Sequence, residues 1–554
     1  MTRTGETQDP RAFSPSALNR FLACEHRTYL DILERRGQMR GLRLLPDMSL
    51  LFERGDRHED AVVAGLAAEG LDVVALEDKD ATVEERAERT IAAMREGRGI
   101  LHQGCFARDG WLGYPDFLIR IDKPSDLGAW SYEVYDAKLG SHPQPRHIFQ
   151  LLFYTDELER LQGGRPERMH LMLGDGTAPA FAPDDFAAYA ARVRAEFEDR
   201  FAELAGLEPD PAYPYRVSEC QFCHWWKVCS DRRRADDHVS LVANLHRGQG
   251  LKLEAAGTHT VGDLADLDED TTILRLTRAS LGTLRAQASI QIRSRPLERP
   301  LYELLGPEAG RGLARLPEPS AGDVFFDFEG DPYWGEDGLE YLFGTAYEDD
   351  GKWRYWPLWA TTRGEERHAL EQWLAWITDR LDKHPDLHVF HFNAYEPTAL
   401  KKLVTRHAVG EYELDELLRR KVLVDLYGIS RQAIRAGVES YGLKALEPVI
   451  GFERDAELRG AIGSLRRWQA WQDGGDQKHL DGIAGYNEDD CAATWALYRW
   501  LLDRRPEAEH QYGIELASLQ PEPPKAPTAK LAAYLARLEA MRPRLLTGLP
   551  DDEA

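Results

Sequence analysis

A carboxylate and an ammonium group lie two residues apart at Asp136 and Lys138. Residues 132–139 alternate as in a β-strand, so both side chains point to the same side of that strand. A second strand, expected over 113–120, has the carboxylate of Asp116 at its start. Carboxylate oxygens suit Mg²⁺ or Mn²⁺, and a lysine can offset charge that develops on a phosphate. These residue types therefore predict a divalent-cation site beside a scissile phosphate.

A second carboxylate pair lies on an apolar strand expected over 323–330. Asp327 and Glu329 are two residues apart, so both face one way. A buried strand does not hold two like charges together without a cation. Further along, a strand leads to Glu396, and Tyr486 and Asp490 stand four residues apart on one face of an expected helix. The second half of the chain therefore predicts a second cation site.

Three cysteines are separated by two and by five residues. These are Cys220, Cys223 and Cys229. Such a spacing brings thiols to one ion or cluster more readily than into disulfides, and Cys24 is the expected fourth donor. His224 competes with Cys24 for that role, and zinc or simply buried free cysteines are the alternatives to a cluster. Cys105 lies in an expected strand and is interpreted as a core residue.

The elements that must position these residues predict an α/β fold. In the first half, a helix capped by Ser14 leads to Cys24, and a second helix is expected to begin near Glu53. The remaining expected elements there are strands at 100–106, 113–120, 130–139 and 168–173 and helices at 145–160 and 183–206. In the second half we expect strands at 340–347, 353–360 and 421–426, a helix from 486 to 502, and a tail helix at 529–541.

The domain prediction follows from these patterns. It comprises an α/β unit over 1–235, a helical connector over 236–320, a second α/β unit over 321–505 and a tail over 506–554. Within the connector, residues 251–265 resemble a helical hairpin whose glycine turn would approach a nucleic-acid backbone, although a structural spacer explains them equally well. Residues 306–320 hold several Pro and Gly residues and are expected to be a linker.

Composition limits the possible functions. The chain has 554 residues and a formal net charge of −25, which argues against a general polyanion-coating protein. No apolar run reaches the length of a membrane span, and the polar first ten residues carry no signal-peptide segment. We therefore expect a cytoplasmic protein with no membrane partner. The sequence contains no P-loop motif, so it is not itself a P-loop motor.

The order of motifs in the first half resembles the RecB-like family of PD-(D/E)xK nucleases, and more closely its CRISPR-associated and AddB-type members with a 4Fe–4S cluster. The resemblance covers roughly residues 14–232. It implies that Cys24 and the three later cysteines hold the cluster, that Asp116, Asp136 and Lys138 form the PD-(D/E)xK motif, and that His58 is an additional metal ligand. Gln150 and Tyr154 match the helix motif near the active site of that family.

The second half is similar to the DEDD exonuclease branch of the RNase H-like fold, over about residues 322–503. The resemblance implies that Asp327, Glu329, Glu396 and Asp490 hold two Mg²⁺ or Mn²⁺ ions and that Tyr486 positions the attacking water. The family usually has Asp where this chain has Glu396, which reaches one methylene further. Two other carboxylates are possible substitutes, Asp425 and Asp489.

Together, the motifs predict a metal-dependent nuclease, with exonuclease action favoured, that hydrolyses DNA, single-stranded or from an end, in repair, recombination or defence. Two alternatives remain open. One is a nucleic-acid-binding or recruiting subunit with one or both sites inactive, working with a separate helicase partner. The other is an exonuclease directed at RNA. Metal-dependent cleavage by the purified protein separates the enzyme from the binding subunit.

Overall fold

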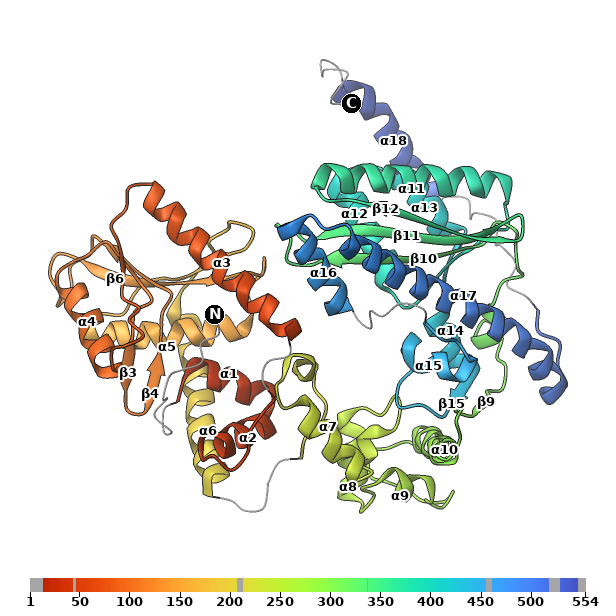
Figure 1. Ribbon diagram of the computed structural model, residues 1–554, viewed down its shortest axis with the longest axis horizontal. Helices are drawn as coiled ribbons and strands as arrows, with labels where there is room; N and C mark the ends of the chain where they lie inside the picture. Colours follow the sequence, from red (N-terminus) through yellow and green to blue (C-terminus); the bar gives the residue numbers. More distant parts are fainter. Residues whose placement is uncertain are drawn as a thin grey trace.

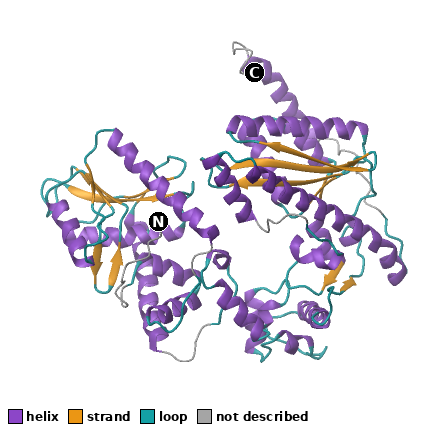
Figure 2. Cartoon of the chain, viewed as in Figure 1, coloured by secondary structure: helices purple, strands orange, loops and turns teal. Residues whose placement is uncertain are grey.

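The structure is a computed structural model that describes residues 13–42, 46–206, 213–335, 337–454, 461–517 and 529–546. Two lobes, each built around a mixed sheet, are joined by a helical stretch (Figure 1). Colouring by secondary structure shows helices around both sheets and the mainly helical character of the joining stretch (Figure 2). The predicted α/β fold is therefore confirmed.

The sheet of the first lobe has the order β1-β2-β5-β6-β7-β8. Its strands are β1 (Val73–Ala75), β2 (Ile100–His102), β5 (Phe117–Ile121), β6 (Ser131–Lys138), β7 (Met169–Leu173) and β8 (Ala180–Phe181). The central strand β6 pairs antiparallel with β5 and parallel with β7. This arrangement places the carboxyl end of β6, with Lys138, beside the beginning of β5.

Two expected strands of this sheet have different bounds. The strand expected over 100–106 ends at His102, and the one expected from 113 begins at Phe117. Between them lies a hairpin of β3 (Phe106–Arg108) and β4 (Trp111–Gly113), which is not part of the six-stranded sheet. Pro115 has no N–H to donate to a ladder, which is consistent with a break before β5.

The first lobe contains seven α-helices among its described residues. They are α1 (Pro15–Ala23), α2 (Glu25–Arg35), α3 (Pro46–Ala68), α4 (Val83–Arg95), α5 (Pro145–Gln162), α6 (Ala187–Gly206) and α7 (Trp226–Ala235). Of these, α2 and α7 belong to a separate apolar cluster beside the core of the sheet. Ser14 caps α1 as expected, because its Oγ accepts the Ala17 N–H at 3.0 Å. The helix expected near Glu53 begins earlier, at Pro46, so His58 lies well inside α3 rather than in its first turn. The helix expected from 183 has a 3-10 turn first and begins at Ala187.

The helical stretch between the lobes has a small apolar core of its own. It contains α8 (Arg247–Ala255), α9 (Val261–Ala265) and α10 (Arg278–Ser294). Gly257 turns the chain between α8 and α9 with a φ of +86°, a conformation that favours glycine. The segment expected to be a linker over 306–320 differs from the prediction, because Leu313 and Leu316 are buried in the core of the second lobe.

The second lobe has a five-stranded sheet of order β12-β11-β10-β13-β14. The strands are β10 (Val324–Asp331), β11 (Leu339–Asp349), β12 (Lys352–Trp359), β13 (Val389–His391) and β14 (Leu423–Asp425). The first three are antiparallel neighbours, whereas β13 and β14 run parallel to β10. A separate two-stranded sheet joins β9 (Tyr302–Leu304) to β15 (Ile434–Ala436).

Helices cover both faces of this sheet. They are α11 (Arg363–Lys383), α12 (Tyr395–His407), α13 (Glu411–Arg419), α14 (Leu426–Ala433), α15 (Leu443–Ile450), α16 (Ala461–Gly474) and α17 (Lys478–Tyr512), and the tail forms α18 (Ala529–Leu546). Figure 1 shows α11 on one side of the strands and α17 on the other. The helix expected from 486 thus begins earlier, at Lys478, which places Tyr486 and Asp490 in its interior rather than at its start.

One helix of the first lobe contacts the second. The Nη1 of Arg54, on α3, donates to Asp331 Oδ1 at 2.8 Å, and its Nε donates to Gln469 Oε1 of α16 at 2.8 Å. Both members of the Arg54–Asp331 ion pair are buried. Helix α3 therefore links the two lobes, because it packs against β6 of the first lobe and against α16 of the second (Figure 1).

Candidate metal centres

The first predicted centre lies where β5 and β6 meet. Asp136, at the end of β6, is fully buried, and its carboxylate pairs with Lys138 Nζ. Asp116, just before β5, accepts the Ala137 N–H at 2.8 Å and lies 3.8 Å from Lys138 Nζ. The structure therefore brings the three predicted residues together at one end of the strands.

The charges at this centre perturb one another. Burial and the Asp136 carboxylate raise the pKa of Asp116 well above its ordinary value. Burial alone would lower the pKa of Lys138, but the two aspartates outweigh it and raise that pKa. A buried carboxylate with a raised pKa gains from a nearby cation, so this donor set fits Mg²⁺ or Mn²⁺.

The helix residues predicted for this centre also contact it. Gln150, on α5, donates from Nε2 to Asp136 Oδ1 at 3.1 Å and to Tyr154 OH at 3.4 Å. The Tyr154 hydroxyl donates in turn to the Tyr114 carbonyl at 2.8 Å. Both side chains therefore fix the position of Asp136 and of the turn before β5.

His58, predicted as an additional metal ligand, contacts the backbone of β7. Its Nε2 lies 3.2 Å from the Met172 carbonyl of β7, in hydrogen-bonding contact. Its neighbour Glu59 was missed by the sequence interpretation, although it acts electrostatically on both Asp116 and Lys138 and its Oε1 lies 2.8 Å from His102 Nε2. The sequence signal that could have indicated Glu59 was its position next to His58, since either of the two adjacent helix residues could face the sheet.

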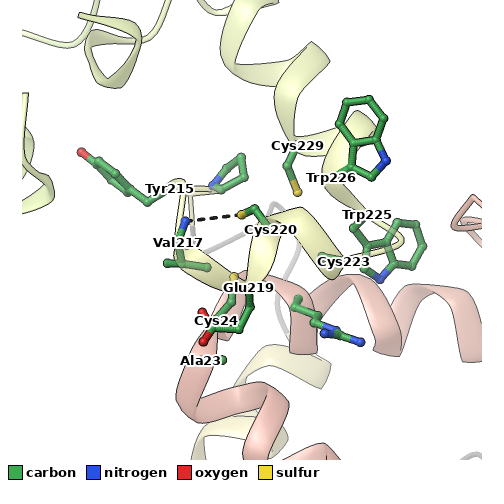
Figure 3. Close-up of a pocket in the computed structure, with 12 residues that line it drawn as sticks. Ala23, Cys24, Tyr215, Val217, Glu219, Cys220, Cys223, Trp225, Trp226 and Cys229 are labelled. Carbon is green, nitrogen blue, oxygen red and sulfur yellow. Dashed lines mark hydrogen bonds between the residues drawn. The ribbon is translucent and has the colours of Figure 1, made fainter. Parts of the chain in front are cut away.

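The four predicted cysteines line one pocket, together with Arg27, Tyr215 and Trp226. Figure 3 shows Cys24, from the junction of α1 and α2, facing the segment that carries the other three. The Val217 N–H donates to Cys220 Sγ at 3.4 Å. Burial and the neighbouring thiols raise the pKa of Cys229 to about 12. Four clustered thiols whose ionisation needs a positive partner fit a metal ion or an iron–sulfur cluster.

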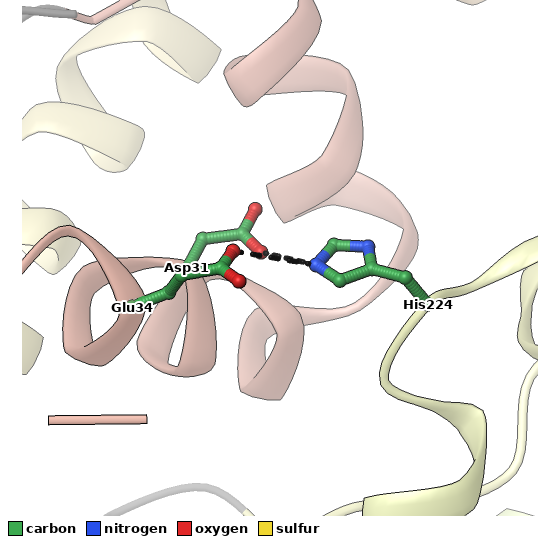
Figure 4. Close-up of side chains that lie close together, drawn as sticks. All are labelled: Asp31, Glu34 and His224. Atoms are coloured by element: carbon green, nitrogen blue, oxygen red, sulfur yellow. Dashed lines mark ion pairs between the residues drawn. The ribbon is translucent and has the colours of Figure 1, made fainter. Parts of the chain in front are cut away.

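His224, the competing donor, faces a different partner set. Its Nε2 lies 3.7 Å from Asp31 Oδ1 and 3.6 Å from Glu34 Oε2, both on α2 (Figure 4). Asp31 is further held by the indole N–H of Trp225 at 2.8 Å. Cys24 is among the residues that line the thiol pocket, whereas His224 is not.

The second predicted centre begins on β10, whose alternation separates apolar and acidic side chains. Phe326 and Phe328 belong to the core under α11. Asp327 points the opposite way, where the Asn487 amide of α17 donates to its Oδ2 at 2.8 Å. Glu329 shares that side of the strand. Strand periodicity therefore places both carboxylates between β10 and α17.

Helix α17 completes this centre. One oxygen from each of Asp327, Glu329 and Asp490 lies within 4.8 Å of the others. Tyr486, one turn before Asp490, is buried and accepts a hydrogen bond from Lys444 Nζ at 2.9 Å. The three carboxylates form a compact donor set for a divalent cation.

The three carboxyl groups of this centre all have raised pKa values. Burial, followed by the Asp490 and Glu396 carboxylates, raises the pKa of Asp327 well above its ordinary value. Burial raises the pKa of Glu329 to about 8. Burial also raises the pKa of Asp490, against the opposing effect of the Arg454 guanidinium. A divalent cation would favour the ionised form of these buried groups.

Comparison with protein families now identifies this lobe. Residues 324–502 match the family model of the RNase_H superfamily. The C-terminal lobe is RNase H-like. A search of curated proteins found no match to the chain. An RNase H-like domain indicates a nuclease-type function on nucleic acids, and RNase H-like nucleases use divalent metals.

The fourth carboxylate predicted for this centre is Glu396, at the start of α12. It is buried, and its Oε2 lies 3.3 Å from His391 Nδ1. Its carboxyl group also hydrogen-bonds Asp327, which places it at the edge of the centre. The extra methylene compared with Asp therefore does not keep Glu396 away from Asp327.

The alternative carboxylates are placed as follows. Asp425 caps α14, where its two oxygens accept the Tyr427 and Gly428 N–H groups at 2.9 and 3.2 Å. Its Oδ1 also accepts the Asn393 N–H at 2.9 Å. Asp489 is buried beside Asp490 on α17. The capping role explains Asp425 without a metal.

Two positively charged side chains of the RNase H-like domain contact this centre, and neither was predicted as a site residue. Lys444 lies on α15 and contacts Tyr486, and Arg454 follows α15 and donates to Asp490 Oδ1 at 2.6 Å. Lys444 and Tyr486 are 42 positions apart, so no local spacing indicates their contact. Arg454 carried no sequence signal, because its contact with Asp490 depends on how α15 and α17 pack.

Among the described residues, no helix has both the length and the apolar character required to cross a membrane.

Proposed function

We propose that this chain is a Mg²⁺- or Mn²⁺-dependent nuclease that hydrolyses phosphodiester bonds of DNA, single-stranded or from an end. The observation that supports this most strongly is the convergence of Asp327, Glu329 and Asp490 inside the RNase H-like domain. Repair, recombination or defence against mobile elements would use such an activity. Cleavage from 3′ ends is the proposed action of this domain.

At the RNase H-like centre, Asp327, Glu329, Glu396 and Asp490 would hold the metal ions. Bound divalent ions supply Lewis-acid stabilisation of the attacking and leaving oxygens and lower the pKa of a bound water. The Tyr486 hydroxyl, fixed by its hydrogen bond from Lys444, would orient the attacking water. Burial of Glu329 and Tyr486 keeps bulk water away from these groups.

A second active site is proposed in the first lobe. Asp116 and Asp136 would hold a cation, and Lys138 would orient the water or offset charge at the phosphorus. The salt bridge between Lys138 and Asp136 supports this, because it places the ammonium group at the ligand cluster. Glu59 is an additional candidate ligand, whereas His58 would have to leave its contact with the Met172 carbonyl.

The thiol pocket is proposed to hold a 4Fe–4S cluster. The shared pocket and the raised pKa of Cys24, Cys223 and Cys229, each due first to burial, support a positively charged occupant. Zinc has the same four-thiolate chemistry and is the alternative. Metal analysis of the purified protein decides between iron and zinc.

A nucleic-acid-binding subunit that works with a helicase is the second candidate function. The observation that favours it is that Glu396 stands where the DEDD family usually has Asp, with its Oε2 3.3 Å from His391 Nδ1. In that case the centre would hold nucleic acid without cutting it.

The test is cleavage of end-labelled DNA and RNA by the purified chain with Mg²⁺, Mn²⁺ or EDTA. We expect metal-dependent shortening of DNA that EDTA stops. DNA left intact with both metals would contradict the proposed activity, and retained binding to that DNA would favour the subunit with a helicase partner. Shortening of RNA alone would reassign the substrate.

A further inference from the structure

Arg454 is held between two carboxylates at the RNase H-like centre. Its Nε donates to both oxygens of Glu447, at 3.0 and 3.2 Å, and its Nη2 donates to Glu447 Oε1 at 2.5 Å and to Asp490 Oδ1 at 2.6 Å. The side chain is 11% exposed. One arm of the guanidinium is thus bonded to a residue that a metal ion would also need.

A second cation lies on the same side of the centre. Lys444 precedes Glu447 by one turn of α15, and its Nζ bonds the Tyr486 hydroxyl. The opposite side, at Asp327 and Glu329, has uncharged partners in Asn487 and Ser464. Among these contacts, the positively charged side chains therefore lie only on the side of the carboxylates where α15 packs against α17.

Arg454 and a cation at the centre would both bind the same carboxylate, that of Asp490. A divalent ion that takes the Asp490 oxygens competes directly with Nη2, whereas the Nε bonds to Glu447 can remain. The Nη1 atom is buried and has no hydrogen-bond partner among the described residues. Metal binding would thus leave a fixed guanidinium with donors available beside the ions. The paired N–H donors of a guanidinium group match two oxygens of a phosphate.

We propose that Arg454 exchanges Asp490 for a backbone phosphate of the nucleic acid when metal binds, with Lys444 beside it. In metal-free protein the guanidinium neutralises Asp490, and in metal-bound protein it holds the substrate strand. Metal and nucleic acid therefore bind with positive coupling, each raising the affinity for the other. This assignment rests on the proposed nuclease function of the same centre.

The proposal predicts opposite effects on metal and on substrate. Arg454→Ala removes a competitor for Asp490, so Mn²⁺ should bind several-fold more tightly without nucleic acid, measured by calorimetry in an Asp136→Asn background. The same change removes a charge-assisted bond to phosphate. The activity to measure is the DNA cleavage that Asp490→Ala abolishes. For this cleavage, Arg454→Ala should raise the KM about 10- to 100-fold, with a smaller change in kcat.

Two variants control this test. Arg419→Ala removes the same charge from a surface ion pair with Asp415 on α13 and should change neither quantity. Arg454→Lys keeps the charge but loses the paired N–H donors, so its KM should rise less than that of Arg454→Ala. A purely structural arginine would instead weaken metal binding when it is removed.

Weaker Mn²⁺ binding by Arg454→Ala, or a KM equal to that of Arg419→Ala, would overturn the proposal. If Asp490→Ala abolishes no cleavage, the proposed nuclease function of this centre fails instead. The Mn²⁺ titration without nucleic acid still decides whether Arg454 competes for Asp490.

Discussion

The carboxyl group of Glu329 illustrates how burial and function are linked at the scale of one residue. Its pKa is raised from 4.5 to about 8, first by burial, because Ser464 and Lys444 offset that effect only partly. The folded metal-free protein therefore binds this proton more tightly than the unfolded chain does. Folding stability should fall as the pH rises through the window from 4.5 to about 8.

Glu329→Gln should flatten that fall in the metal-free protein, because glutamine does not titrate. Thermal unfolding at a series of pH values measures it. In the wild type, Mn²⁺ binding at about pH 6 should release the proton of Glu329. At about pH 9 this proton is already lost, so Mn²⁺ binding should not release it. Calorimetry in buffers of different ionisation enthalpy detects the difference. An unchanged pH profile in Glu329→Gln would show that this group is already ionised in the metal-free state.

At the scale of elements, the close approach of α17 to β11 places Asp490 near β10. Gly344 of β11 lies against the Asn487 side chain of α17, and a Cβ there would overlap the amide. Asn487 cannot move aside easily, since its Oδ1 accepts from Tyr355 OH at 2.9 Å and its Nδ2 donates to Asp327. The missing side chain thus permits the contact between helix and sheet.

Gly344→Ala should therefore separate α17 from the sheet and cost about 1–3 kcal/mol of stability. Metal binding at the RNase H-like centre should weaken with it, because Asp490 moves with α17. Gly364→Ala is the matched control, since nothing lies within 4 Å of a Cβ there. Chemical denaturation and Mn²⁺ titration of both variants measure the effect, and equal stability of the two would contradict this packing.

Helix α3 provides a second prediction at this scale. Arg54→Ala leaves the buried Asp331 carboxylate without its ion-pair partner, and breaking a buried pair costs about 3–5 kcal/mol. Arg57→Ala breaks an exposed pair with Asp473, whose loss costs at most about 1 kcal/mol. Hydrogen exchange of α3 and of the end of β10 should rise sharply in the first variant alone. Similar exchange in both would mean that α3 does not hold the lobes together.

At the scale of the whole molecule, the strand pattern was the most informative sequence signal. The spacing of Asp327 and Glu329 predicted a carboxylate pair on one face of β10, because a strand has a fixed period of two. Contacts between distant segments had no such signal. Arg54 with Asp331 and Arg454 with Asp490 depend on how helices pack, and no local pattern encodes that packing.

The bounds of some strands and the burial of one loop segment were also hard to predict. The hairpin of β3 and β4 includes the end of the strand expected over 100–106 and the start of the strand expected over 113–120. The burial of Leu313 and Leu316 was hidden because Pro and Gly around them are typical of linkers. In both cases the composition of a short segment suggested one structure, and its tertiary contacts selected another.

The thiol pocket connects the two ends of the first lobe. Cys24 precedes α2, and Cys229 lies in α7, so a cluster bound to both would close a very long loop. Cys24→Ser should therefore lower the iron content and destabilise the lobe as a whole. Cys105→Ser, which changes a buried cysteine outside the pocket, should keep the iron. Iron analysis and absorbance near about 400 nm measure this, and stoichiometric zinc without iron would contradict a 4Fe–4S cluster.

The central claim is that the chain has two separate active sites, and one cleavage assay tests it directly. Lys138→Ala and Asp490→Ala are compared with the wild type on 5′-labelled single-stranded DNA in Mg²⁺ or Mn²⁺. Asp490→Ala should abolish stepwise shortening from the 3′ end, by about 10²–10³-fold, whereas Lys138→Ala should leave it intact and remove a different set of products. Identical product patterns from Asp490→Ala and the wild type on both DNA and RNA would show that the RNase H-like centre is inactive. Loss of every product in either single variant would contradict two independent sites.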